Sequence, residues 1–149
     1  MIDGVVITPL KKIVDERGAV MHMLRSDSDV FAAFGEIYFS RIRPGVVKAW
    51  HFHKHMTINY AVPCGQIKFV LFDSRENSKT KGTVQEIDLG EKNYRLITVP
   101  PRIWNGFCCI GDEMALVANC TTLPHHPDES EKCDPDDLKI PYTWLMPSS

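Results

Sequence analysis

The sequence contains no long apolar run. Its longest apolar segments, such as residues 67–72, are far shorter than the about 20 residues that a membrane-spanning helix needs, and this one contains Lys68. The first ten residues also lack the basic start and apolar core of a secretory signal. We therefore expect a cytoplasmic protein without a membrane partner.

An excess of charge of one sign is missing as well. The chain has 17 lysine and arginine residues against 19 aspartate and glutamate residues, which gives a formal net charge of −2 at pH 7. Proteins that bind nucleic acid through its phosphates carry a clustered excess of basic residues, whereas the charges here are scattered. We therefore expect no nucleic-acid partner.

Cysteine patterns that are typical of zinc knots and disulfide frameworks are also absent. The five cysteines form an odd set without a Cys-x-x-Cys pair: Cys64, Cys108, Cys109, Cys120 and Cys133. This usage is typical of reduced thiols that are mostly buried.

Helical periodicity is nearly absent, and strand signals dominate. The one helix that we expect covers residues 27–34, with Asp27 or Ser28 as its N-cap and Gly35 at its end. Elsewhere, short runs rich in Val, Ile, Phe and Tyr recur between turn-forming residues. The predicted strands are residues 5–7, 19–24, 36–42, 46–51, 59–62, 66–72, 84–89, 95–99, 104–110 and 113–119.

This pattern predicts a single all-β domain over residues 1–149. About ten short antiparallel strands must close or double over to hide their edges, and a jelly-roll barrel does so while leaving a mouth for a small molecule. We therefore predict a cupin jelly-roll barrel, also called a double-stranded β-helix. Residues 123–149 are predicted to form a short irregular tail packed on the barrel. In this tail, His125 and His126 lie between two prolines, which favours an exposed turn over a place at the cavity mouth.

Three histidines occupy alternate positions, at His51, His53 and His55. Residues two apart on a strand face the same side, so the spacing predicts three imidazoles that converge on one face. Such a cluster suits either metal ligation or proton transfer near neutral pH.

The rest of the metal-binding cupin pattern is incomplete. Gly45 and the first two histidines fit its opening, but Thr57 and Ile58 stand where the pattern has glutamate, and Asn105 stands where it has its final histidine. His55 is the one available substitute for a missing ligand. We therefore expect no bound metal, and histidines that act as acid, base and hydrogen-bonding groups.

Five segments carry further motifs in a fixed order. They are Asp15-Glu16-Arg17-Gly18; Gly45-Val46-Val47-Lys48-Ala49-Trp50-His51; Gly65-Gln66-Ile67 with Asp73-Ser74-Arg75 and Ser78; residues 99–107; and residues 134–140 with Trp144. In this order they resemble the motifs of the dTDP-4-dehydrorhamnose 3,5-epimerases, metal-independent cupins that epimerise nucleotide-linked 4-keto sugars. The resemblance covers most of the chain and implies that no cofactor is needed.

The resemblance also implies roles for individual residues. His51 matches the base that removes the proton next to the ketone, and Asp134 or Asp136 matches the aspartate that orients this base. The alternative for Asp134 is a solvated tail charge. Arg17 is a candidate for the positive charge that binds the substrate's diphosphate. Arg75 is a second candidate for that role, although its spacing from Asp73 favours a structural ion pair.

Several positions depart from the family pattern. Ala118 stands where the family has its catalytic tyrosine, and Ile58 stands where it has a lysine. Lys48 replaces an arginine of the family, and Asn105 replaces a histidine. We still expect Lys48 and Asn105 to contact the substrate. Tyr38, His53 and His55 are additional candidates for the residue that supplies a proton from a new direction.

The predicted function is therefore an epimerase or isomerase that acts on a nucleotide-linked 4-keto-6-deoxy sugar. The alternatives are a sugar 3,4-ketoisomerase, which clusters histidines in a similar way, a non-catalytic cupin that binds a sugar nucleotide, and a metal-dependent cupin. Short barrels with an extended N-terminal segment commonly pair across a two-fold axis. We therefore expect a homodimer, as the resemblance also implies.

Overall fold

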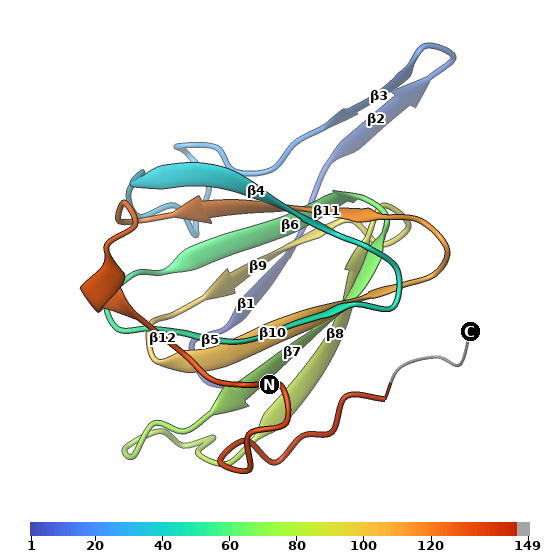
Figure 1. The fold of residues 1–149 in the computed structure, drawn as a ribbon. Coiled ribbons are helices and arrows are strands. Elements are labelled where there is room, and N and C mark those ends of the chain that lie inside the picture. The colour runs from blue at the N-terminus through green and yellow to red at the C-terminus, as the bar shows by residue number, and fades with distance from the viewer. Residues whose placement is uncertain (146–149) are drawn as a thin grey trace.

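The computed structural model describes residues 1–145, which form two facing five-stranded antiparallel sheets and one two-stranded sheet (Figure 1). The strand order is β1-β9-β6-β11-β4 in the first large sheet and β12-β5-β10-β7-β8 in the second, and β2 pairs with β3. The elements are β1 (Val6–Pro9), β2 (Lys12–Asp15), β3 (Gly18–Met21), β4 (Glu36–Ile42), β5 (Val47–His53), β6 (Ile58–Cys64), β7 (Gln66–Asp73), β8 (Val84–Gly90), β9 (Arg95–Val99), β10 (Ile103–Ile110), β11 (Ala115–Thr121), the 3₁₀ helix η1 (Pro127–Glu129) and β12 (Ser130–Lys132). This arrangement is a jelly-roll barrel, and the predicted all-β cupin fold is confirmed.

The main core lies between the two large sheets. Ile67, Phe69 and Leu71 of β7 belong to it, because alternate residues of a strand share a face. Val70 and Phe72, which alternate with these residues, face the other way and belong to a second core cluster. Both faces of β7 are therefore buried, which explains its nearly unbroken apolar sequence.

The C-terminal tail covers this second cluster. Trp50 and Ile140 are almost completely buried in it, and the indole N–H of Trp50 donates to the carbonyl oxygen of Pro135 at 3.2 Å. Tyr142 and Trp144 stack on each other beside Trp50, with their ring centroids 4.9 Å apart. Figure 1 shows the tail running along the lower edge of the barrel.

The first part of the tail is more regular than the sequence predicts. β12 pairs with β5, so that Ser130 lies opposite His53 and Lys132 lies opposite His51. The three residues of β12 are all polar, and no apolar alternation marks them as a strand. This pairing brings the tail to the histidines of β5.

The predicted helix over residues 27–34 is wrong. The segment instead contains successive turns, in which the N–H of Ser28 donates to the carbonyl of Arg25 and the N–H of Phe31 donates to that of Ser28, both at 3.0 Å. Aspartate and serine favour such turns, and two helical turns do not offset the cost of helix nucleation. No helix among residues 1–145 is long and apolar enough to cross a membrane.

The two-stranded sheet is a hairpin that projects from the barrel (Figure 1). Its second strand, β3, begins one residue before the predicted strand at residues 19–24 and ends three residues earlier than predicted. Its first strand, β2, was not predicted, because Lys-Ile-Val-Asp is short and does not alternate. Arg17 lies in the turn between the two strands.

Candidate active site

A cavity of about 410 Å³ opens between the two large sheets, at the end of the barrel next to η1. His51 and His53 of β5 line one wall. Tyr38 of β4 and Tyr60 of β6 line the wall formed by the other sheet. Imidazoles and phenols therefore lie on opposite walls, and both kinds of group transfer protons in enzymes.

His51 has positive charges around it. Burial lowers the pKa of this histidine. The charges of Lys132, His53 and Lys48 lower this pKa further. The imidazole is therefore neutral at neutral pH and able to accept a proton.

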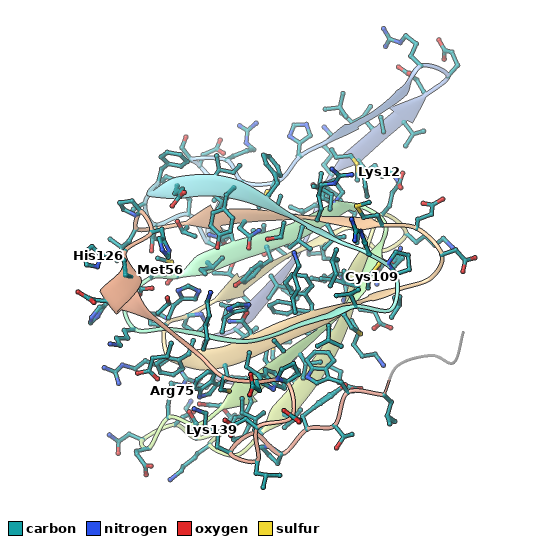
Figure 2. The ribbon with its side chains drawn as sticks, in the orientation of Figure 1. Lys12, Met56, Arg75, Cys109, His126 and Lys139 are labelled. Carbon is teal, nitrogen blue, oxygen red and sulfur yellow. The ribbon has the colours of Figure 1, made fainter. Side chains whose placement is uncertain are left out.

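A buried carboxylate contacts the second histidine. Glu129, at the end of η1, is 7% exposed, and its Oε1 lies 2.8 Å from Nδ1 of His53. Its other oxygen, Oε2, accepts the backbone N–H of His55 at 2.7 Å and that of Met56 at 2.9 Å. Burial by itself raises the pKa of Glu129, but these hydrogen bonds outweigh burial and lower it. Glu129 is thus ionised at neutral pH. Figure 2 labels Met56 at this end of the molecule.

The structure does not bring the predicted partner Asp134 to His51. Lys132 is the residue of the tail that lies opposite His51, and Asp134 follows in an exposed turn, where its carbonyl accepts the N–H of Asp137 at 3.0 Å. Asp136 is exposed in the same turn. The carboxylate that reaches the histidines therefore comes from the start of the tail rather than from the Asp-Pro motif.

The third histidine of the alternating set does not face the cavity, so the predicted convergence of three imidazoles is wrong. β5 ends at His53, and His55 is exposed in the bend that follows. The bend is held by Glu129, whose carbonyl accepts the N–H of Lys54 at 2.8 Å while its carboxylate accepts that of His55. Strand alternation therefore stops before it reaches this residue.

The phenols of the opposite wall keep their protons at neutral pH. Tyr60 is buried, and its hydroxyl donates to Oδ1 of Asn105 at 3.3 Å. Burial raises the pKa of Tyr60 well above its ordinary value, and the neighbouring Tyr38 adds to this effect. Burial also raises the pKa of Tyr38, as does the charge of Glu36. Tyr60 went unrecognised in the sequence because it reads as a core residue of an apolar strand.

Both tyrosines flank one position of β11. Asn119 lies opposite Tyr38 on one side and opposite Tyr60 on the other, and all three residues line the cavity. Adjacent residues of a strand face opposite sides, so Ala118 points away from the cavity. The position of β11 that faces the cavity is therefore Asn119, and not Ala118 as the resemblance implies.

Two lysines place positive charge at the cavity. Lys48 and Lys132 both line it, and Nζ of Lys48 donates to the carbonyl of Arg41 at 2.7 Å. Lys132 lies outside the family motifs, and it was not predicted from the sequence as a site residue. His125 also lines the cavity at its mouth, where its backbone N–H donates to Oε1 of Glu36 at 2.9 Å.

The two predicted arginines lie elsewhere. Arg17 is at the tip of the projecting hairpin, where it pairs with Asp15 at 2.6 Å and its side chain is 84% exposed. Arg75, labelled in Figure 2, pairs at 2.8 Å with the fully buried Asp73 and donates to the carbonyl of Asp3 at 2.7 Å. The contacts of Arg75 are those of a structural ion pair.

The remaining predicted residue, Asn105, lines the cavity next to His51. Asn105 and His51 are paired in the strand register, and Nδ2 of Asn105 lies 3.4 Å from the carbonyl oxygen of His51. Among residues 1–145, no three His, Cys, Asp or Glu side chains are grouped closely enough to hold a metal ion.

These features define a class of protein: a cupin-type jelly roll whose internal site carries proton-transfer groups on two walls. Comparison with known proteins narrows the class to one family. The family profile described as dTDP-4-dehydrorhamnose 3,5-epimerase matches residues 1–149. The chain belongs to this family and is an enzyme of the isomerase type, as predicted.

Individual relatives agree with this assignment. The spore coat polysaccharide biosynthesis protein SpsL of Bacillus subtilis is 34% identical over 142 residues, which cover 95% of this chain and 91% of SpsL. The probable low-salt glycan biosynthesis epimerase Agl13 of Haloferax volcanii is 39% identical over 143 residues, which cover 95% of this chain and 88% of Agl13. The crystal structure of a dTDP sugar isomerase from Desulfovibrio desulfuricans G20 is 49% identical, with a TM-score of 0.94 over 96% of this chain and 92% of that chain.

Proposed function

We propose that the protein inverts a carbon next to the ketone of a nucleotide-linked 4-keto-6-deoxy sugar, by proton transfer between the two walls of the cavity. The observation that carries this proposal is the placement of His51 and His53 on one wall and of Tyr38 and Tyr60 on the other. Inversion requires a base on one face of the sugar ring and an acid on the other. An imidazole wall and a phenol wall supply these two groups.

The chemistry follows from the protonation states of these groups. A neutral imidazole of β5 takes the weakly acidic proton next to the ketone, and the resemblance favours His51 for this role. The resulting enolate carries negative charge, which Lys48 and Lys132 stabilise from the same cavity. A phenol of the opposite wall then returns a proton to the other face of the carbon.

The two lysines also suit the diphosphate of a sugar nucleotide. Lys48 and Lys132 attract an anion to the cavity, and a bound diphosphate would offset the positive charge that these lysines impose on His51. The diphosphate of such a substrate would therefore bind to the lysines and, by offsetting their charge, would favour formation of an imidazolium at His51. Solved relatives of the same fold include a Legionella pneumophila epimerase in complex with dTDP-4-keto-L-rhamnose, which has a TM-score of 0.86 at 24% identity.

Deuterium exchange tests the proposed function. The native protein should incorporate solvent deuterium into dTDP-4-keto-6-deoxyglucose, and a double variant that lacks both imidazoles of β5, His51→Asn with His53→Gln, should lower the rate by about 10²-fold or more while it still binds dTDP. Binding without exchange by the native protein would instead indicate a non-catalytic sugar-nucleotide protein. A 3-keto product would indicate a ketoisomerase.

We also propose a homodimer. β4 is one of the two edge strands of its sheet, and its outward-facing Ile37 and Phe39 are 48% and 60% exposed. The projecting hairpin exposes Val14 at 66% and Val20 at 59%, and an isolated two-stranded ribbon is only marginally stable in water. A second copy of the chain would cover both features. The cytoplasmic location stays a prediction.

A further inference from the structure

The two cavity-lining histidines of β5 have opposite electrostatic surroundings. Within residues 1–145, His53 contacts a buried carboxylate, with 2.8 Å between its Nδ1 and Oε1 of Glu129. The groups that act on His51 are positive ones. A carboxylate therefore lies beside the ring of His53, whereas positive charges act on the ring of His51 and oppose its protonation.

The contact with Glu129 also fixes which nitrogen of His53 carries a proton. An ionised carboxylate only accepts hydrogen bonds, so Nδ1 of His53 must donate to it. In the neutral ring the lone pair is then on Nε2. Because His53 lines the cavity, Nε2 is the nitrogen that remains for a substrate.

The carboxylate of Glu129 cannot rotate away from this contact without losing two hydrogen bonds to the backbone. Its Oε2 accepts two backbone N–H groups, from His55 and Met56, and the carboxylate is 7% exposed. These bonds hold the carboxylate in one orientation and close the bend after β5. His53 therefore has an oriented and charge-balanced ring.

We infer that His53 is a catalytic proton-transfer residue of this site and that Glu129 is its positioning residue. The inference rests on the proposed function and assigns the proton transfer to His53, positioned by Glu129, neither of which the family motifs indicate.

In the step that we infer, Nε2 of His53, in place of the His51 that the resemblance favours, takes the proton from the carbon next to the ketone. The electron pair of the broken C–H bond moves into the bond to the carbonyl carbon, and the negative charge moves to the carbonyl oxygen. The imidazolium of His53 is balanced by Glu129. A proton from the opposite wall then forms a new C–H bond on the other face, so no oxidant or reductant is consumed.

Glu129→Gln tests the positioning role through the tautomer of His53. The N–H groups of His55 and Met56 need an acceptor, so the amide oxygen of the glutamine takes the place of Oε2. The amide NH₂ group then faces Nδ1 of His53, which has to accept. The ring proton moves to Nε2, and this nitrogen no longer takes a proton from the substrate.

We expect Glu129→Gln to lower the rate of deuterium incorporation into dTDP-4-keto-6-deoxyglucose by about 10²- to 10⁴-fold, with little change in KM. Nitrogen-15 NMR should show His53 protonated on Nδ1 in the native protein and on Nε2 in the variant. Glu131→Gln is the matched control, because Glu131 is exposed on the neighbouring β12 and lies opposite Phe52. It should keep the native rate and tautomer.

His53→Gln provides a second variant that leaves Glu129 in place, and it should lose exchange to a similar extent. Exchange at the native rate in His53→Gln, or in Glu129→Gln with a switched tautomer, overturns the inference while the proposed function stands. A native protein that exchanges no deuterium overturns the proposed function and the catalytic role with it. The NMR measurement then still reports whether Glu129 sets the tautomer.

Discussion

At the scale of single residues, His51 differs from an ordinary solvent-exposed histidine because it lies half-buried among positive charges. Burial and the charges of Lys132, His53 and Lys48 all favour its neutral form. A carboxylate partner, which would have the opposite effect, contacts His53 instead. Two histidines of one strand therefore have different electrostatic surroundings.

This charge effect predicts the titration of His51. The pKa of His51 should lie below the ordinary value of 6.5. Lys132→Gln removes one positive charge and should raise this pKa, so the ring becomes protonated at a higher pH in the variant. NMR titration of the imidazole measures both values. Lys92→Gln, at an exposed position between β8 and β9, is the control and should leave the midpoint unchanged. An unchanged midpoint in Lys132→Gln would show that this lysine does not act on His51.

The phenol wall predicts a second effect at this scale. His53 lies on the same wall as His51 and His55 is exposed, so Tyr38 and Tyr60 are left as acids for the opposite face. Replacing both tyrosines with phenylalanine should lower product formation by about 10²-fold or more while deuterium exchange persists. The single variants show which phenol transfers the proton. Rapid inversion by the double variant would contradict a phenol as the acid.

At the scale of elements, the turn between β7 and β8 is held by one carboxylate. Asp73 accepts hydrogen bonds from Arg75 through Oδ1 at 2.8 Å and from Ser78 and Thr80 through Oδ2, both at 2.6 Å. Burial by itself raises the pKa of Asp73, but these bonds outweigh burial and hold the pKa well below its ordinary value. The ionised form of Asp73 therefore stabilises the turn.

Asp73→Ala should lower the free energy of unfolding by about 3 kcal/mol, because it leaves a partly buried arginine without its partner. Urea denaturation measures the loss. Glu76→Ala removes an exposed pair with Lys81 in the same turn and should cost less than about 1 kcal/mol. Since the folded-state pKa of Asp73 is depressed, its contribution is present above pH of about 4 and is lost as the pH falls further. Equal losses in the free energy of unfolding for the two variants would show that the buried pair stabilises the protein no more than the exposed pair does.

At the scale of the whole molecule, the barrel exposes apolar side chains on the edge strand β4 and on the projecting hairpin. Phe39→Glu places a charge on the outward side of β4 and should convert a dimer into a monomer. Light scattering at micromolar concentration measures the mass. Leu138→Glu changes a side chain that is 98% exposed in the tail and should leave the dimer intact. A native protein with the mass of one chain would rule out the homodimer at that concentration.

The strand pattern and one face of the site were accessible from the sequence, because they depend on local alternation. The predicted bounds of β4 and β9 agree with the structure, and those of the other predicted strands shift by a few residues. His51 and His53 share a face of β5 because they are two residues apart. The same rule does not extend to His55, because a contact from a distant segment bends the chain there.

The partners of those histidines depend on tertiary structure alone. Glu129 lies 76 residues from His53, and Tyr60 lies 45 residues from Asn105, so no spacing within the sequence links either pair. The sequence by itself determined the jelly roll, the family and the histidine wall, since strand alternation and ordered motifs are local properties. The pairing of β12 with β5 alone decides which carboxylate contacts which histidine. Its register places Ser130 opposite His53 and Lys132, rather than Asp134, opposite His51.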